Sequence, residues 1–354
     1  MRIDPHVHLR DWPVQRHKET LEHGFSTAWK AGLSGVFEMP NTDPALVSEK
    51  VILERMKMGR AALDKLSLPL FHGIIAGLTS RKEQVEKIAD VWRRYFPRVT
   101  GLKMFAGHST GNMGIPDPEA QLHIYRTLTD LNYTGVLMVH CEKESLLRPE
   151  LFDPGKPESH LEARPPEAEV ESVRDQIRWA GESGFKGVLH ICHVSVPQSL
   201  SLIEEGRNSL GGRLTCGITP HHALLSADDM KGKDGILLKV NPPLRLEGMR
   251  GEMFRALMNG RIDWIETDHA PHTETEKREK YLSGLPVLQF YGSFIRILKD
   301  NGIDDGLLEK LTSGNIVRAF NLPEDLFPVN PGAVGINPEE YGFDPFGSVR
   351  LKRY

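Results

Sequence analysis

The sequence has few cysteines and lacks the patterns of a secreted or membrane-spanning chain. Its 354 residues include 3 cysteines, Cys141, Cys192 and Cys216, which lie singly in apolar stretches and form no CxxC pair. This spacing is typical of reduced core residues and not of a disulfide framework. No apolar run approaches the roughly 18 residues of a membrane span, and the amino terminus has no secretory hydrophobic region. We therefore expect a cytoplasmic protein with no membrane partner.

The sequence also lacks an excess of positive charge. Lys and Arg total 44 against 48 Asp and Glu, which gives a formal net charge of −4. A nucleic-acid-binding surface needs clustered basic residues, so no nucleic-acid partner is expected. Hydrophobic residues make up 39% of the chain, enough to bury a large core, which excludes a largely disordered protein.

Short apolar runs alternate with amphipathic stretches along the chain, and we see no internal repeat or low-complexity segment. The expected strands are Ile3–Leu9, Gly35–Met39, Leu70–Ala76, Gly101–Phe105, Val136–Cys141, Gly187–Val194, Leu214–Thr219 and Trp264–Thr267. The expected helices include His17–Ala31, Lys50–Leu66, Lys82–Tyr95, Glu119–Leu131, Glu167–Ser183 and Pro197–Glu205. Continuously apolar strands indicate burial on both faces, as in a parallel sheet covered by helices. Eight such strands predict an α/β fold, a (β/α)8 TIM barrel with parallel strands.

No linker divides the array, so we expect one domain over residues 1–354. The first expected strand begins almost at Met1, which predicts that a full accessory β-sandwich domain is absent. The segment from about 322 to 354 is rich in Pro and Gly, and we expect it to pack on the barrel as an irregular tail.

The chain contains 15 histidines, and several of them fall at the ends of expected strands. His6 and His8 stand two residues apart in DPHVHLR, so they point to the same face of the first strand. Lys103 lies in GLKMF, and the remaining polar groups at strand ends are His140, His190, His193, Asp268, His269 and His272. Catalytic groups of a barrel gather at the carboxyl ends of its strands.

Taken singly, each of these residues has an ordinary explanation. An HxH pair is commonly two hydrogen-bonded surface histidines, and a lysine in an apolar strand commonly extends its amine to solvent. Several suitable groups at five strand ends together favour a metal centre. Histidine and carboxylate ligands without thiolates indicate zinc, with manganese or cobalt as alternatives.

The number of these ligands exceeds the need of one catalytic ion, which keeps a position open for water. A two-metal site would use all of them if a further group bridged the ions. An amine cannot do this, whereas a lysine converted by carbon dioxide to its carbamate presents two anionic oxygens. That step is a chemical inference about Lys103.

The motifs DPHVHLRD, MPNTDPA, GLKMFAG, VHCE, HICHVS, TPHH, VNPPLR and TDHAPH occur in this order. The set resembles the amidohydrolase superfamily and specifically its dihydroorotases, over about residues 1–321. The resemblance implies two Zn²⁺ ions, one held by His6, His8 and Asp268 and the other by His140 and His193. Carboxylated Lys103 would bridge them, Asp268 would also be catalytic, and His190 would be structural.

The same resemblance implies a substrate pocket. Arg10, Asn41 and His272 match residues that hold the carboxylate of dihydroorotate, and Asn241, Ser283 and Gly284 match positions that contact its ring. Arg10 suits this role because a planar guanidinium can bind a carboxylate through two hydrogen bonds. Ser109 and Thr110 fall in a segment that resembles a mobile loop closing over substrate.

The implied activity is the reversible cyclisation of N-carbamoyl-L-aspartate to dihydroorotate in pyrimidine biosynthesis. Hydantoinase, dihydropyrimidinase and allantoinase share the implied ligands, but their substrates lack the ring carboxylate and have no need of Arg10 with His272. An inactive barrel serving as a scaffold for aspartate transcarbamoylase is a further alternative. The resemblance also leaves open a homodimer and an association of the active enzyme with aspartate transcarbamoylase.

Overall fold

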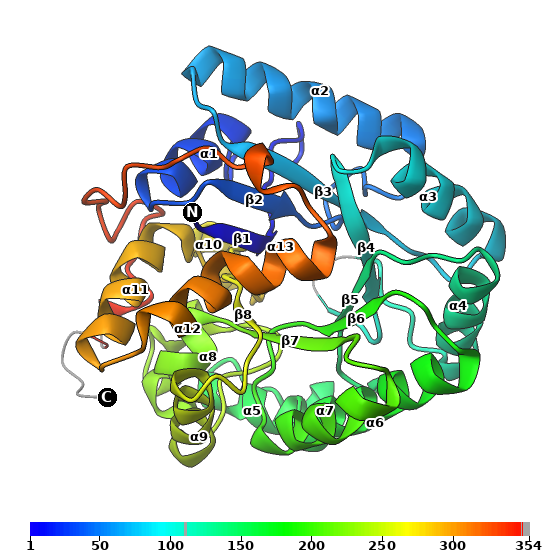
Figure 1. Ribbon diagram of the computed structural model, residues 1–354. Helices are drawn as coiled ribbons and strands as arrows, with labels where there is room; N and C mark the ends of the chain where they lie inside the picture. The colour runs from blue at the N-terminus through cyan, green and yellow to red at the C-terminus, as the bar shows by residue number, and fades with distance from the viewer. Residues whose placement is uncertain (110–111, 348, 350–354) are drawn as a thin grey trace.

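The computed structural model describes residues 1–109, 112–347 and 349. Eight parallel strands form one sheet in the order of the chain, and helices surround it (Figure 1). The strands are β1 (Ile3–Val7), β2 (Gly35–Glu38), β3 (Phe71–Gly77), β4 (Val99–Phe105), β5 (Val136–His140), β6 (Val188–Ile191), β7 (Leu214–Ile218) and β8 (Trp264–Ile265). The predicted α/β barrel with eight parallel strands is confirmed.

Contacts between the first and last strands bring the sheet round on itself. Val7 pairs with His269 in a parallel bridge, and the His8 amide donates to the His269 carbonyl at 2.7 Å. Asp4 accepts hydrogen bonds from the backbone and the hydroxyl of Thr267 just below this bridge. The carboxyl ends of β1 and β8, where candidate metal ligands lie, are therefore held together directly.

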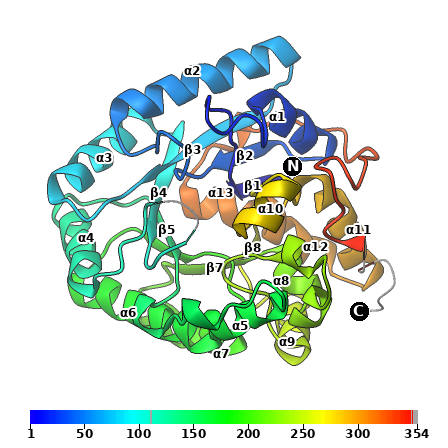
Figure 2. The same ribbon diagram turned by 180° about the vertical axis from the view of Figure 1, so that it is seen from behind.

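The helices lie outside the strands, as a barrel requires (Figures 1 and 2). They are α1 (Leu21–Lys30), α2 (Glu49–Leu66), α3 (Lys82–Tyr95), α4 (Pro118–Asp130), α5 (His160–Ala163), α6 (Pro166–Ser183), α7 (Pro197–Ser209), α8 (Pro220–Leu224), α9 (Glu247–Met258), α10 (Glu274–Lys280), α11 (Tyr291–Asp300), α12 (Asp305–Glu309) and α13 (Asn315–Phe320). Short 3-10 turns are η1 (Glu144–Leu146), η2 (Pro149–Leu151), η3 (Pro157–Ser159), η4 (Ala227–Met230), η5 (Gly235–Leu238), η6 (Leu288–Phe290) and η8 (Glu324–Leu326), and η7 (Lys310–Gly314) is a π-helical turn. No helix of the described residues is long and apolar enough to cross a membrane.

The first helix begins later than predicted. We placed its start at His17, whereas α1 begins at Leu21 because the side chain of Thr20 caps it by accepting from the His23 amide. The preceding residues form a turn instead of helix. This turn places Lys18 and Glu19 beside the loop that follows β8.

The amino end of the barrel is closed by an aromatic and aliphatic cluster. Phe320 of α13 packs edge-on against Phe37 of β2, with ring centroids 5.1 Å apart, and lies 6.0 Å from the ring of Trp264. Figure 1 shows α13 crossing this end, and Figure 2 shows α10 at the opposite side of the molecule. The cluster leaves the carboxyl end as the open face of the barrel.

The segment after α13 is irregular over its described residues and packs on the barrel. The Asn330 amide donates to the carbonyls of Trp29 and Leu33, and Phe346 stacks on Phe290 with ring centroids 3.9 Å apart. Tyr341 donates its hydroxyl proton to the buried carboxylate of Glu19 at 2.5 Å. The tail is thus connected to α1 and to the loop before it.

Candidate active site and metal centre

A small hollow of about 30 Å³ opens at the carboxyl ends of the strands. Its lining consists of His6, His8, Arg10, Asn41, Phe105, Ser109, His140, His193, Asn241, Asp268, Ala270, Ser283 and Gly284. These residues lie at the ends of seven of the eight strands, all except β3, or in the segments that follow them. The fold therefore brings together most of the residues singled out in the sequence.

The first group of candidate ligands joins β1 to the end of β8. Oδ1 of Asp268 lies 2.8 Å from Nε2 of His8 and 3.3 Å from Nε2 of His6. One ligand atom from each residue lies within 4.8 Å of the others, and all three residues are buried. The alternation of β1 explains the pairing, because His6 and His8 are on one face of the strand.

The second group joins β5 to the loop after β6. Nδ1 of His140 faces Nε2 of His193 at 3.3 Å, and the ring of His193 lies 5.4 Å from that of His6. His193 has φ +39° and Asp268 has φ +48°, conformations that non-glycine residues rarely adopt. Such strain concentrates at functional sites because the surrounding structure must enforce it. Here it turns the side chains of both residues toward the hollow.

Two buried glutamates hold these histidines, and the sequence analysis missed both. Nε2 of His140 donates to Glu142 at 3.0 Å, and Glu142 is ion-paired with Arg164. This bond leaves Nδ1 of His140 as the nitrogen directed at His193. Arg164 and His140 hold the pKa of the Glu142 carboxyl well below its usual range, although burial alone would raise it. Carboxylates that accept from a ligating histidine fix its orientation and tautomer.

Glu266 supports the other side of the site. Its Oε2 lies 3.1 Å from Nε2 of His190 and 3.6 Å from Nδ1 of His6, and its Oε1 accepts from the His193 amide. His190 is fully buried and stacks on Trp264 at 4.0 Å. We interpreted His190 as structural. Its contacts place it below the hollow beside Glu266, which also accepts from the backbone amide of His193.

Lys103 of β4 is fully buried beside this cluster. Its Nζ lies 3.0 Å from Sγ of Cys192 and 5.1 Å from the ring centre of Phe105. Burial raises the pKa of Cys192 to about 12, so the thiol is neutral and does not compensate the ammonium charge. Cys192 was assigned to the core from its apolar surroundings; it is buried, but it also contacts Lys103.

Five basic side chains are buried in the described part of the chain. They are Arg10, Arg55, Lys103, Arg245 and Lys277. Arg55 is paired with Glu38 and Arg245 with Glu169. Lys277 donates to three backbone oxygens, including that of Gly284 at 2.6 Å. These three cations have partners that offset the cost of burial.

Arg10 and Lys103 differ from the other three. In the described residues Arg10 forms no ion pair, its Nη1 donates to the Asn41 carbonyl at 3.3 Å, and its buried Nε has no partner. Burial lowers the pKa of Arg10, while more distant carboxylates such as Glu19 oppose that effect. A buried guanidinium without a direct ion pair, in the wall of a hollow, indicates an anionic ligand.

The remaining candidate residues occupy the rim and the wall behind it. The Asn241 amide lies 3.5 Å from Oγ of Ser109, and Oγ of Ser283 accepts from Lys239 at 2.9 Å. Gly284 has φ +143°, and a side chain there would come within 3.0 Å of the His272 ring. His272 itself lies behind Gly284 and not in the lining. Thr110 lies outside the described residues.

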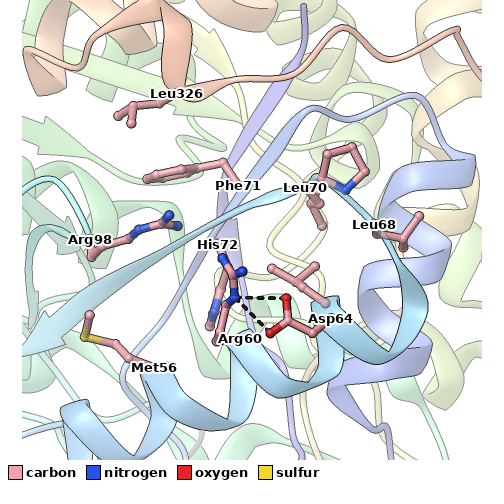
Figure 3. Close-up of a pocket in the computed structure, with 11 residues that line it drawn as sticks. Met56, Arg60, Asp64, Leu68, Leu70, Phe71, His72, Arg98 and Leu326 are labelled. Atoms are coloured by element: carbon pink, nitrogen blue, oxygen red, sulfur yellow. Dashed lines mark hydrogen bonds and ion pairs between the residues drawn. The ribbon is translucent and has the colours of Figure 1, made fainter.

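A larger hollow, about 420 Å³, lies elsewhere, between α2 and β3 (Figure 3). Its walls include Arg60 and Arg98 with several apolar side chains, and Arg60 is paired with Asp64. None of the candidate metal-binding clusters lies in this hollow. Volume alone therefore does not locate the chemistry, and the smaller hollow has the reactive groups.

The residues around the small hollow fit a divalent metal. Burial lowers the pKa of His8 to about 4 and that of His193 well below its ordinary value, with the charge of Lys103 adding to the second effect. Both rings are therefore neutral at pH 7, the form that ligates metals. Nδ1 of His193 is buried with no hydrogen-bond partner among the described residues, whereas Nδ1 of His6 faces Oε2 of Glu266 at 3.6 Å. Neutral imidazoles beside an ionised carboxylate form a donor set typical of zinc.

Comparison with known proteins agrees with this chemistry. No protein-family model matches the chain. It is 33% identical over 279 residues to the dihydroorotase of Brevibacillus brevis, and 29% identical over 329 residues to that of Fusobacterium nucleatum. These alignments cover 78% and 91% of this chain, respectively. The chain is a relative of the dihydroorotases.

The shared region does not extend over the whole of these relatives. The chain spans 61% of the Brevibacillus brevis dihydroorotase and 72% of the one from Fusobacterium nucleatum. Among solved structures it superposes on L-hydantoinase from Arthrobacter aurescens with a TM-score of 0.82 and 19% identity, over 98% of this chain and 80% of that one. It matches Saccharomyces cerevisiae dihydroorotase in complex with 5-fluoroorotic acid with a TM-score of 0.73 and 18% identity, over 92% and 85%. At such identities the superpositions establish the barrel fold and nothing finer.

Proposed function

We propose that this protein is a metal-dependent dihydroorotase, which interconverts N-carbamoyl-L-aspartate and dihydroorotate. The observation that carries the proposal is Arg10, a buried guanidinium with no ion pair among the described residues, in the wall of a histidine-lined hollow. Dihydroorotate differs from a plain cyclic ureide by a ring carboxylate, the group that such an arginine binds.

His6, His8 and Asp268 would hold one Zn²⁺, and His140 with His193 would hold a second. Lys103 would bridge the two as its carbamate, which also replaces an uncompensated buried ammonium by an anion. When bound, the metals supply Lewis-acid polarisation of the amide carbonyl and activation of water. Manganese or cobalt would suit the same ligands.

In ring opening, an oxygen–carbon bond forms at the amide carbon and the carbon–nitrogen bond of the ring breaks. The proton released by the attacking water passes to Asp268, whose carboxylate lines the hollow. Asp268 then delivers that proton to the departing ring nitrogen, so the carboxylate returns to its starting form. His6 and His8 hold the pKa of the Asp268 carboxyl well below its usual range against the effect of burial, which keeps the carboxylate ionised.

The substrate carboxylate would lie against Arg10 and Asn41, with His272 reaching it from behind Gly284. Asn241, Ser283 and the backbone of Gly284 would contact the ring, and Ser109 would lie over its outer edge. We propose the same role for Thr110, the residue after Ser109.

Hydantoinase or dihydropyrimidinase activity is the second candidate, because the same metal ligands are implied for those enzymes. Their substrates have no ring carboxylate, so they would leave Arg10 buried without an ion pair. This cost is the reason to rank dihydroorotate first. Allantoinase activity meets the same objection. An inactive scaffold would not require the strained backbone at His193 and Asp268.

We further propose that the protein acts in the cytoplasm in de novo pyrimidine biosynthesis. Residues 1–354 would form one barrel domain with residues 322–354 as its tail. A homodimer, or an assembly with aspartate transcarbamoylase, would be detected by measuring the mass of the purified protein alone and after mixing.

Turnover of purified, metal-loaded protein tests the proposal. Dihydroorotate, hydantoin, dihydrouracil and allantoin should be compared at equal concentration, together with cyclisation of N-carbamoyl-L-aspartate. The expected result is a clear preference for the two carboxylated compounds. Faster hydrolysis of dihydrouracil or hydantoin would move the protein to the second candidate function.

A further inference from the structure

Lys18 contacts the candidate carboxylate-binding histidine from the side away from the hollow. It belongs to the turn between β1 and α1, and its Nζ lies 3.2 Å from Nδ1 of His272 and 3.1 Å from Oε1 of Glu276. The Lys18 side chain is only 10% exposed. The sequence analysis gave it no role.

The chemistry of this contact fixes where the His272 proton resides. An ammonium group has donors and no acceptor, so Nδ1 of His272 must accept the hydrogen bond. Oε2 of Glu276 also faces that nitrogen but lies farther away, at 3.8 Å against 3.2 Å for Nζ of Lys18. A neutral imidazole that accepts at Nδ1 has its proton on Nε2. Burial lowers the pKa of His272 to about 3, so the ring is neutral at pH 7.

The nitrogen that keeps the proton has no partner. Nε2 of His272 is buried and makes no hydrogen bond among the described residues. The Cδ2–Nε2 edge of the ring faces Gly284, where an added Cβ would lie 3.0 Å from Cδ2. Gly284 lines the hollow, so a single residue without a side chain separates this edge from the space available to a ligand.

Glu276 holds Lys18 in place. It forms a capping box with Thr273 at the start of α10, in which each side chain accepts from the other residue's backbone amide. His17 Nε2 lies 3.3 Å from the same carboxylate. The turn after β1 and the segment after β8, which provide Arg10 and His272, are therefore connected through Lys18 and Glu276.

We propose that Lys18 is a positioning residue that keeps His272 in the Nε2–H tautomer, so that His272 donates to the substrate carboxylate beside Arg10. Lys18 would thereby contribute to the preference for carboxylated substrates without touching them. This inference rests on the proposed function, because it needs a carboxylate at Arg10.

Two measurements test it together. The first is steady-state kinetics with dihydroorotate for Lys18→Met, Lys18→Arg and the surface control Lys87→Met. Lys18→Met should raise KM about tenfold, the loss of one hydrogen bond to a charged group, with a smaller change in kcat. Lys18→Arg, which also only donates, should restore most of the wild-type KM, and Lys87→Met should match the wild type.

The second is nitrogen NMR of protein labelled at histidine, with His272 assigned through His272→Gln. The wild type and Lys18→Arg should show a protonated Nε2 and an accepting Nδ1, and Lys18→Met should show a mixture of tautomers. An unchanged His272 spectrum or an unchanged KM in Lys18→Met would overturn the inference. If the wild type does not turn over dihydroorotate, the proposed function fails, and the spectrum still decides whether Lys18 sets the tautomer.

Discussion

The Nη1 atom of Arg10 donates to the backbone oxygen of Asn41 over 3.3 Å, while Nε of the same guanidinium is buried without a partner among the described residues. Arg10→Met should therefore relieve a burial cost in the free protein and remove the charge that binds the substrate. We expect KM for dihydroorotate to rise about 10- to 100-fold, the range for a lost charge-assisted hydrogen bond. Turnover of an uncharged ureide should change little.

Arg98→Met is the matched control for that variant. Arg98 lines the hollow between α2 and β3 (Figure 3), lies over the ring of Phe71 at 5.0 Å and is not part of the lining of the small hollow. Its kinetics should equal those of the wild type. Equal KM values for Arg10→Met and Arg98→Met would remove the argument for a carboxylated substrate.

Lys103→Ala should lower the metal content of the protein and abolish most of its activity, because the bridging group is lost. Metal per chain, measured by elemental analysis after gel filtration, should fall below the wild-type value. Short carboxylic acids such as acetate should restore part of the activity, since they can occupy the space of the carbamate. Full activity in Lys103→Ala without added acid would show that no carbamate is needed.

The fold was predictable because its signal is local. Each strand is a short apolar run between amphipathic segments, and that pattern identifies buried parallel strands without any knowledge of their partners. Strand ends were predicted less well. The segments Ile3–Leu9 and Gly187–Val194 were expected to be strands throughout, whereas β1 ends at Val7 and β6 at Ile191. Strand pairing ends just before His8 and His193, where the backbone turns these side chains toward the hollow.

The residues around the hollow were predictable from their motifs, but their supporting partners were not. Glu142 and Glu266 follow strands like many other acids, and only the register of the barrel shows that they contact His140 and His190. Cys192 was predicted to lie in the core from its apolar neighbours in the sequence, and it does lie there. The sequence gives no local sign that Lys18 lies next to His272, since 254 positions separate them.

Glu19 should make the stability of the protein sensitive to acid. Burial alone would raise its pKa, but His269, His23 and the Tyr341 hydroxyl hold it at about 2, below the ordinary 4.5. A carboxyl with a lowered pKa stabilises the fold above about pH 4.5 and loses that contribution as the pH falls toward 2. The full contribution is roughly 3 kcal/mol.

Urea unfolding of the wild type and Glu19→Gln between pH 7 and pH 3 measures this contribution. The free energy of unfolding should fall less steeply with acid in Glu19→Gln, and the two curves should approach each other at the lowest pH. Tyr341→Phe removes one donor to Glu19 and should give an intermediate slope. Parallel curves for all three proteins would show that Glu19 is not the sensitive group.

Asp268→Asn separates the two roles proposed for this residue. Asparagine keeps a side-chain oxygen that can ligate a metal, but it cannot take a proton from water and pass it to the ring nitrogen. General acid–base catalysis contributes about 10²- to 10⁴-fold, so kcat should fall by that factor in both directions. A purely structural ligand predicts instead that activity falls only in proportion to metal. Metal content and kcat must therefore be measured on the same preparation.

Asp263→Asn is the control, because Asp263 precedes β8 at the opposite end of the strand. Its carboxylate accepts from the Cys216 amide at 2.8 Å and pairs with Arg207, so the substitution removes a partly buried charge without approaching the hollow. This variant should lose stability and keep its kcat per bound metal. If Asp268→Asn retains its metal and turns over at close to the wild-type rate, Asp268 does not carry the proton. The leaving nitrogen must then be protonated by another group in the hollow, or by solvent.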